Sequence, residues 1–360
     1  MGSSTRLKDI AENLNLSIGT VQRALNNKGG YSPETQMKIL EEAKRLDYTA
    51  NVAASALRRP PINIAVVLPK PEGTDKYFFQ YVWKGIENAC QDLSIYNINL
   101  SRHYCELKSE ESISEFEKIL NGEYGKVNGV ITNAMSNPKI LAVLKEISDK
   151  GIPTFRMNAT TQLYQFKNGF SSSSNMYVGQ LCADIFSAIL REKEGQLLLL
   201  GGYRESDRQS ERINNFQRAM MKSCPGILMN EIHIFNDIPR LKRAIEEYLK
   251  KFDNLLGIYA VSARETLSMC EIVKSLGLSG KIVTVGIDVF PELLPFFEDG
   301  TLTSSIYQYP VQQGYMAVKA MVSDMTQTNF QYANLRFPAT AVFKSNAEAF
   351  TQMNDIVYSM

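Results

Sequence analysis

The residue types that support metal binding and nucleophilic catalysis are scarce in this chain of 360 residues. Its two histidines, His103 and His233, lie far apart, and none of its five cysteines forms a C-x-x-C pair. A zinc site or a histidine-dependent catalytic triad needs these side chains in closer spacing. No G-x-G-x-x-G or G-x-x-x-x-G-K motif occurs, which disfavours a nucleotide cofactor. We therefore expect a protein that is not an enzyme and carries no metal and no cofactor.

Basic residues are concentrated at the start of the chain. The whole chain has 39 basic and 38 acidic residues and a net charge of +1, but its first sixty residues alone carry +3. Such a segment is attracted to nucleic acid. The charge of the whole chain argues against a protein whose entire surface is basic. No apolar run of about 18 residues is present, so we expect no membrane partner. The first residues lack an apolar signal region, so we expect a cytoplasmic protein.

The basic segment has helical periodicity. Leu7, Ile10, Ala11 and Leu14 recur at the spacing of one helix face. Ser17 is a suitable N-cap for a second helix, and Ser32-Pro33 begins a third whose inner face is Ile39, Leu40, Ala43 and Leu46. Two short helices joined by about four residues and followed by a third form a helix-turn-helix plan. A generic three-helix bundle has the same spacing.

From Ile62 onward, short apolar runs alternate with amphipathic segments. The expected strands are Ile64–Leu68, Val127–Thr132, Thr154–Met157, Gln196–Leu200, Leu255–Val261 and Ile282–Ile287. The expected helices are Phe79–Leu93, Ile113–Leu120, Pro138–Asp149, Met176–Arg191, Asp207–Met221, Pro239–Lys251, Ala263–Leu276 and Val311–Met325. This alternation predicts parallel sheets built from βαβ units. Nearly 300 residues exceed one comfortable sheet, so we expect two doubly wound halves with a ligand cleft between them.

From Thr5 to Arg59 the chain resembles the DNA-binding head of the lactose-repressor (LacI) family. The matching run reads TRLKDIAENLNLSIGTVQRALNNKGGYSPETQMKILEEAKRLDYTANVAASALRR. The second half of that family is a sensor, which agrees with the alternating pattern. The resemblance implies an all-α helix-turn-helix head plus an α/β sensor of two doubly wound, periplasmic-binding-protein type I-like subdomains around a cleft. The implied boundaries are 1–50 for the head, 51–61 for a hinge helix and linker, 62–345 for the effector-binding domain and 346–360 for a C-terminal tail.

The resemblance implies which head residues contact DNA. The second helix would lie in the major groove, where Ile18, Gly19 and Arg23 match base readers. Arg23 suits a bidentate contact to guanine, whereas Gly19 departs from the family's large polar residue and Ile18 suits only apolar features such as a thymine methyl. Gln22 either compensates as a reader or contacts phosphate. Further contacts, mostly to phosphate, are implied for Thr5, Ser17, Thr20, Asn26 and Thr35, of which Thr5, Ser17 and Thr35 also suit simple capping.

The family's hinge helix matches the segment from Asn51 to Arg58. That helix forms when two copies of the chain meet on DNA, and Leu57 matches its minor-groove wedge. An apolar wedge unstacks a base step and kinks the duplex. The alternative for Leu57 is packing within a linker. Because one head makes few base contacts, we expect a homodimer on a pseudo-palindromic operator in double-stranded DNA.

The resemblance also assigns sensor residues to the effector. Phe78 and Phe79, after the first strand, match aromatic residues that stack on a sugar ring, with core packing as an equal alternative. Arg212 matches an arginine that donates to two ligand hydroxyls, and Arg208 lies nearby. The other implied contacts are Asn158, Asp288 and Gln308. Many members have Asn-Asp where this chain has Ser262-Ala263, so the effector is larger or oriented differently.

These observations favour a transcriptional repressor controlled by a small sugar or polyol. A purine or amino acid is an alternative effector. A second interpretation is a solute-binding protein of a sugar transport system, against which the helix-turn-helix pattern argues. A third, an enzyme of the doubly wound class, is disfavoured by the scarce histidines and missing phosphate loops.

Overall fold

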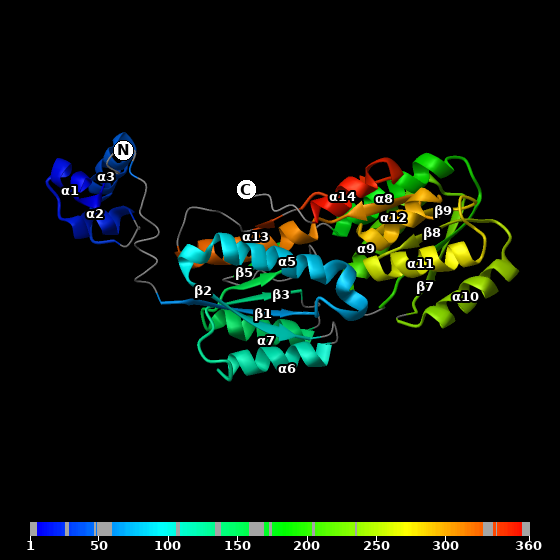
Figure 1. The fold of residues 1–360 in the computed structure, drawn as a ribbon, viewed down its shortest axis with the longest axis horizontal. Coiled ribbons are helices and arrows are strands. Elements are labelled where there is room, and N and C mark those ends of the chain that lie inside the picture. The colour runs from blue at the N-terminus through cyan, green and yellow to red at the C-terminus, as the bar shows by residue number, and fades with distance from the viewer. Residues whose placement is uncertain are drawn as a thin grey trace.

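The computed structural model describes residues 6–25, 29–46, 48, 60–105, 109–133, 138–157, 169–172, 175–203, 206–234, 236–326, 334–335 and 337–354. The described chain begins with three helices and continues into two α/β lobes (Figure 1). No described helix is long and apolar enough to cross a membrane. All five cysteines are free.

Helices α1 (Leu7–Leu14), α2 (Ile18–Leu25) and α3 (Pro33–Arg45) pack against one another. Their shared core consists of Ile10, Ala11, Val21, Ala24, Ile39 and Ala43. The Ser17 hydroxyl accepts the backbone N–H of Thr20 at 3.0 Å, and Ser32 caps α3 by accepting that of Thr35 at 3.1 Å. The expectation that Leu40 faces this core is wrong. Its side chain is 48% exposed because the inner face of α3 is set by Ile39 and Ala43.

The first lobe is built on a sheet with the strand order β11-β5-β4-β3-β1-β2, paired in parallel throughout. Its strands are β1 (Ile62–Leu68), β2 (Ile98–Tyr104), β3 (Gly129–Thr132), β4 (Thr154–Arg156), β5 (Gly169–Ser172) and β11 (Asn334–Leu335). Its helices are α5 (Lys76–Asp92), α6 (Ser109–Leu120), α7 (Pro138–Asp149) and α13 (Pro310–Thr326). Helices α6 and α7 cover one face of the sheet, and α5 and α13 cover the other (Figure 1).

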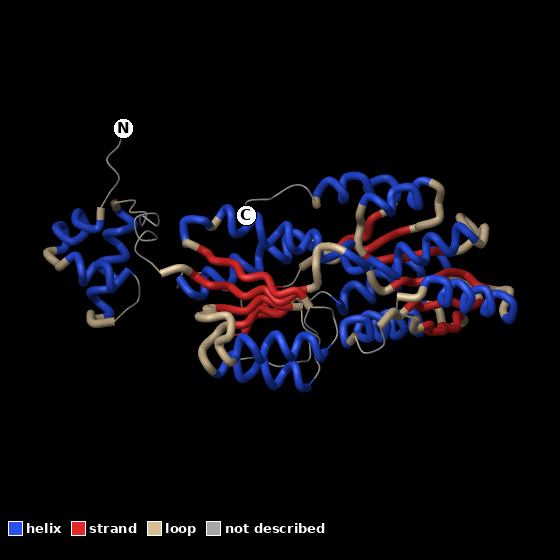
Figure 2. Tube along the Cα trace, turned by 60° about the horizontal axis from the view of Figure 1, so that its bottom comes forward, coloured by secondary structure: helices blue, strands red, loops and turns tan. Residues whose placement is uncertain are grey.

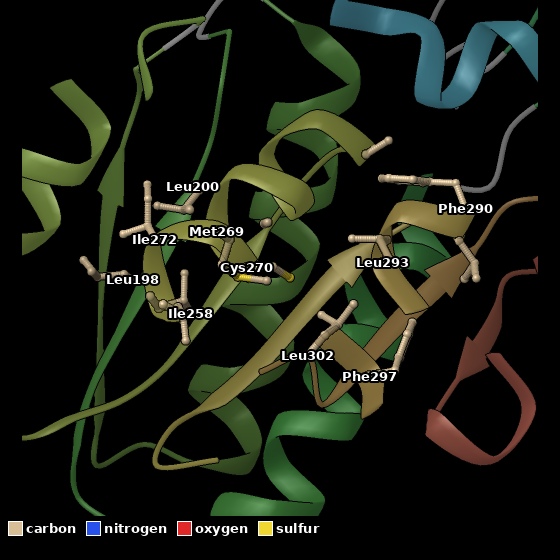
Figure 3. Close-up of a cluster of buried hydrophobic side chains, with 14 of the residues drawn as sticks. Leu198, Leu200, Ile258, Met269, Cys270, Ile272, Phe290, Leu293, Phe297 and Leu302 are labelled. Carbon is tan, nitrogen blue, oxygen red and sulfur yellow. The ribbon is translucent and has the colours of Figure 1, made fainter. Parts of the chain in front are cut away.

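The second lobe is built on a sheet with the strand order β12-β10-β9-β8-β6-β7, in which only β12 is antiparallel. Its strands are β6 (Gly195–Leu200), β7 (Ile227–Ile232), β8 (Leu255–Ala260), β9 (Val283–Ile287), β10 (Ser304–Tyr307) and β12 (Thr340–Val342). Its helices are α8 (Asn175–Leu190), α9 (Asp207–Ser223), α10 (Ile238–Lys251), α11 (Ala263–Ser275), α12 (Leu294–Glu298) and α14 (Ala347–Met353). Figure 3 shows part of its core, where Leu198 and Leu200 of β6 face Met269 and Cys270 of α11.

The chain passes between the lobes three times. It leaves the first lobe between β5 and α8, returns between β10 and α13, and leaves again between β11 and β12. Figure 2 shows the two sheets as separate groups of strands. The second passage contains Gln308 and Tyr309, and Tyr309 has a φ of +59°. Since non-glycine residues rarely adopt this left-handed conformation, the surrounding structure must hold the backbone of the passage in place.

Candidate functional site

A cleft of about 790 Å³ lies between the two lobes. Its walls come from segments that follow the carboxyl ends of strands in both sheets. In the first lobe these are residues 69–79 after β1, residues 104–105 at the end of β2 and Asn133 after β3. In the second lobe they include the start of α9, residues 262–264 after β8, Asp288 after β9 and Gln308 after β10. Ligands of doubly wound sheets bind at this edge, so the cleft is the candidate site.

Arg212 is the best-anchored side chain in the cleft. It lies in the second turn of α9 and is only 5% exposed. Its Nε donates to Oδ1 of Asn175 at 3.0 Å, its Nη1 donates to the carbonyl of Val261 at 2.8 Å, and its Nη2 donates to Gln308. Each nitrogen therefore donates one N–H to an acceptor within the protein. The two remaining N–H groups, one on each terminal nitrogen, are the ones available to a ligand.

Asp288 and Gln308 continue the network from Arg212. The Nε2 of Gln308 donates to the Asp288 carboxylate, 3.0 Å from each oxygen. Asp288 adopts a left-handed φ of +66°, which aspartate tolerates better than most residues. Burial raises the pKa of Asp288 to about 7, although Gln308 and Arg212 act in the opposite direction. This carboxyl group can therefore be neutral or charged near neutral pH, and it suits a hydroxyl-bearing ligand in either form.

Arg208 lies one turn before Arg212 on α9 and is 8% exposed. Ser206 caps this helix by accepting the backbone N–H of Gln209 at 3.4 Å. The Nη1 of Arg208 donates to the backbone carbonyl of Asn133 at 3.2 Å and also to the side-chain oxygen of that residue. This contact joins the second lobe to the first across the cleft.

A second contact across the cleft was not expected from the sequence. Arg264, the second residue of α11, donates from Nη1 to Asp75 of the first lobe at 3.3 Å. Its Nε and Nη2 donate to Glu265 at 3.2 Å each. Burial raises the pKa of Glu265. The ring of Tyr77, which also lines the cleft, stacks on that of Phe290 from the second lobe, with the ring centroids 4.5 Å apart.

Aromatic side chains form one wall of the cleft. Phe78 is partly exposed there, whereas Phe79 is 4% exposed and belongs mainly to the core of the first lobe. Trp83 is buried, and its Nε1 donates to the carbonyl of Pro69 at 2.8 Å. Tyr104 packs edge-on against Trp83 and is 43% exposed. Phe78 and Tyr104 therefore both present exposed ring surface at the cleft.

The structure brings most of the expected effector residues together. The side chains that line this single cleft are Phe78, Phe79, Arg208, Arg212, Asp288 and Gln308. Asn158 lies outside the described residues. Sequence reasoning missed Asp75, Asn133 and Arg264. Their positions after β1, after β3 and at the start of α11 were the available signal, because each follows the carboxyl end of a strand.

The head residues expected at DNA lie mostly on the surface. Ser17, Ile18, Gly19, Gln22 and Arg23 are exposed. Thr20 and Thr35 are half-buried, and each contacts the capping serine three residues before it. Thr5, Asn26, Asn51 and Leu57 lie outside the described residues.

Two parallel α/β lobes linked by three passages and enclosing a cleft define the class of type I periplasmic-binding-protein-like folds. The chain belongs to the periplasmic binding protein domain family, whose model matches residues 64–326. Among solved structures, it is similar to GanP, a glucose-galactose binding protein from Geobacillus stearothermophilus (TM-score 0.69, 20% identity, 80% of this chain and 99% of that one). It is equally similar to a putative LacI transcriptional regulator from Bacteroides fragilis (TM-score 0.70, 16% identity, 81% and 100%). These two similarities concern the fold alone.

Curated relatives include both regulators and a binding protein. The HTH-type transcriptional regulator RegA of Clostridium acetobutylicum is 29% identical over 167 residues, which is 46% of each chain. The probable HTH-type transcriptional repressor ExuR of Bacillus subtilis is 31% identical over 154 residues, 42% of each chain. The match therefore spans less than half the length of these two regulators. The D-allose-binding periplasmic protein of Escherichia coli is 21% identical over 245 residues, 66% of this chain and 78% of that one.

Proposed function

We propose that the protein is a sequence-specific DNA-binding transcriptional regulator, a repressor whose operator affinity is controlled by a sugar-like effector in the cleft. The observation that carries the proposal is a compact three-helix unit placed before a two-lobed binding domain. A binding domain that only captures solutes has no need of such a unit. The presence of regulators among the relatives supports the same interpretation.

Helix α2 is the proposed recognition element. Val21 and Ala24 face the core of the head, which leaves the side that carries Ile18, Gln22 and Arg23 exposed. An exposed helix face fits into the major groove, where an arginine side chain pairs with guanine. Since a single head offers few base contacts, the functional unit is a homodimer that reads a two-fold symmetric operator.

The cleft is proposed to bind a sugar or polyol. Phe78 and Tyr104 offer ring faces, while Arg212, Gln308 and Asp288 offer donors and acceptors held in fixed positions. Such a combination suits a molecule with an apolar ring face and a polar rim. We also propose that the ligand is bound without being transformed, since the Asp288 carboxylate is already engaged by Gln308.

Cleft closure is the proposed link to DNA. Gln308 contacts both Arg212 and Asp288 and lies on a passage between the lobes. A ligand held by this network binds the open and the closed arrangement of the lobes with different affinity. The size of that difference sets how far the ligand shifts their populations. The dimer transmits the change to the heads and alters operator affinity.

A transport-associated solute-binding protein is the second candidate. The similarity to the D-allose-binding protein over two thirds of this chain favours it. The two candidates differ in one property, because only the regulator binds a defined DNA sequence.

The test is an in vitro selection of duplexes from a random library by the full-length protein. The proposal predicts enrichment of one two-fold symmetric sequence, which fluorescence anisotropy then shows to bind at least a thousandfold more tightly than scrambled DNA. Recovery of unrelated sequences with equal affinity would reject the regulator and favour the solute-binding protein.

A further inference from the structure

Arg208 lines the cleft, and one edge of its guanidinium makes no hydrogen bond within the described structure. In the described structure Nη1 makes the contacts of this side chain, and all of them are with Asn133. The Nε and Nη2 groups remain, and these two donors lie parallel on one edge of the guanidinium plane. That edge has the geometry that binds both oxygens of a carboxylate at once.

The charge of Arg208 is not matched by a carboxylate of its own. No carboxylate of the described residues lies within 4.0 Å of its guanidinium, and burial lowers the pKa of Arg208 to about 10. Asp207, its neighbour in the chain, acts on the pKa values of both Arg208 and Arg156, so this one carboxylate is shared between two guanidinium groups. A cation buried in this way costs free energy unless an anion accompanies it.

The other carboxylates near the cleft contact the other two arginines. Asp75 and Glu265 both contact Arg264, and Asp75 also acts to raise the pKa of Arg208. Asp288 is linked to Arg212 by hydrogen bonds through Gln308. At the mouth, Lys70, Glu72 and Glu111 are exposed, so water and salt screen their charges far more than those of the buried groups. The buried end of the cleft therefore has an excess of positive charge at Arg208.

We propose that the effector is an acidic monosaccharide whose carboxylate binds the Nε–Nη2 edge of Arg208 while its hydroxyls bind Arg212, Gln308 and Asp288. This inference rests on the proposed function of the cleft and narrows its ligand class. Arg208 is thus a specificity-determining residue that separates sugar acids from neutral sugars of the same ring. The two-donor edge matches the oxygens of a carboxylate and also those of a phosphate, so a sugar phosphate is the competing ligand that the experiment includes.

A competing role for Arg208 is to tie the lobes together through Asn133. The variant Asn133→Ala separates the two roles, because it removes the side-chain acceptor of Arg208, keeps only the backbone carbonyl, and leaves the guanidinium in place. If Arg208 acts only as a tether, weakening either end of this contact should weaken the binding of acidic and neutral ligands alike. If Arg208 binds the ligand carboxylate, replacing it should weaken the binding of acidic ligands alone.

The experiment measures calorimetric affinities for matched pairs, glucuronate against glucose and galacturonate against galactose, with glucose 6-phosphate as a third arm. In the full-length wild-type protein we expect one hexuronate to bind at least tenfold more tightly than its hexose and more tightly than the sugar phosphate. Arg208→Gln should lower the preference for the uronate by about 10- to 100-fold, because charged hydrogen bonds contribute free energies of that size. The affinity for the hexose should change less than threefold. Arg208→Lys should retain part of the preference, and Asn133→Ala should retain all of it.

Four outcomes would overturn the inference. In the wild-type protein these are equal binding of a hexose and its uronate, and tighter binding of the sugar phosphate. In the variants they are a uronate preference that survives Arg208→Gln, and one that disappears in Asn133→Ala. In each of them a sugar still binds, so the proposed function stands. If no sugar of either kind binds, the sugar-responsive function fails together with the inference.

Discussion

At the scale of single residues, Arg212 is fully anchored in the cleft, whereas Arg208 is only half engaged. Arg212 donates from all three of its nitrogens to Asn175, Val261 and Gln308, whereas Arg208 uses only Nη1. The anchored residue sets the position of the ligand, because its geometry is fixed before binding. The half-engaged residue is free to select among ligands.

Replacing Arg212 with glutamine tests the first role. We expect effector binding to weaken more than a hundredfold, while DNA binding without effector changes less than twofold. The free energy of unfolding should fall by about 1–3 kcal/mol, because Val261 and Gln308 lose a buried donor. Calorimetry, anisotropy and urea titration measure the three quantities. Arg218→Gln, an exposed change on the same helix, is the control and should alter none of them.

Asp288→Asn tests the buried carboxyl group through pH. The folded pKa of about 7 exceeds the ordinary 3.8, so the folded state holds its proton in a range where the unfolded state has lost it. The contribution of this group to stability is therefore largest below pH 4 and declines as pH rises to 7, by roughly 4 kcal/mol in total. Asparagine tolerates the left-handed φ, so the variant should lack this decline. Parallel pH profiles for the two proteins in urea titrations would argue against a neutral Asp288.

Arg23→Ala tests base reading by α2. We expect the preference for the selected operator over scrambled DNA to fall by about 1–3 kcal/mol at constant salt. Lys38→Ala is the control, since Lys38 lies on α3 and its ammonium pairs with Glu34 at 2.8 Å. It should leave the preference unchanged. A competition assay in which the two variants keep the same preference would remove Arg23 from the readout.

Part of the candidate site could be predicted from the sequence. Arg212, Asp288 and Gln308 were identified through a family resemblance and do share one cleft. Arg264 and Asp75 were missed because they are separated by 189 residues, and nothing local in either segment indicates the pairing. The hydrogen bonds from Arg212 to Asn175 and Val261 could not be predicted from the sequence either, since they depend on how α8 and β8 lie beside α9.

At the scale of elements, the central strands and most helices followed from hydrophobic pattern. Helix α7 was predicted with its observed bounds, and β6 to within one residue. Strands β2 and β7 were missed because they lie at sheet edges and mix polar with apolar residues, as in INLSRHY and ILMNEI. Strand β10 was read only as a ligand-bearing segment, because SSIY is short and half polar.

The ion pair between Asp75 and Arg264 is the element-scale feature that bears on closure. It joins the 3₁₀ turn Gly73–Asp75 of the first lobe to α11 of the second, and its side chains are 24% and 12% exposed. Asp75→Asn should weaken effector binding about fivefold, because it destabilises the closed arrangement. Small-angle scattering of the ligand-free variant should show a larger radius of gyration.

A second ion pair between the lobes is the matched control. Lys76 and Glu292 lie 3.4 Å apart, with side chains 37% and 42% exposed. Exposed pairs contribute little, so Lys76→Gln should change effector affinity by less than twofold. Equal effects of the two substitutions would show that burial of the Asp75 pair does not matter for closure.

At the scale of the whole molecule, the protein joins a small basic three-helix unit to a large binding domain of near-neutral charge. The binding domain alone is shared by proteins named as regulators and proteins named as sugar-binding proteins. Its fold therefore does not separate these functions, and the discriminating information lies in residues 6–46. The net charge of +1 conceals this division, because the basic excess of the head is offset by the sensor.

The most direct test of the account is the affinity of the full-length protein for its selected operator, measured by anisotropy with and without a sugar that binds the cleft. Coupling between two sites in one protein is worth about 1–3 kcal/mol, so we predict a 5- to 150-fold change in DNA affinity that disappears in Arg212→Gln. An operator affinity that stays the same when the cleft is saturated would contradict the central claim.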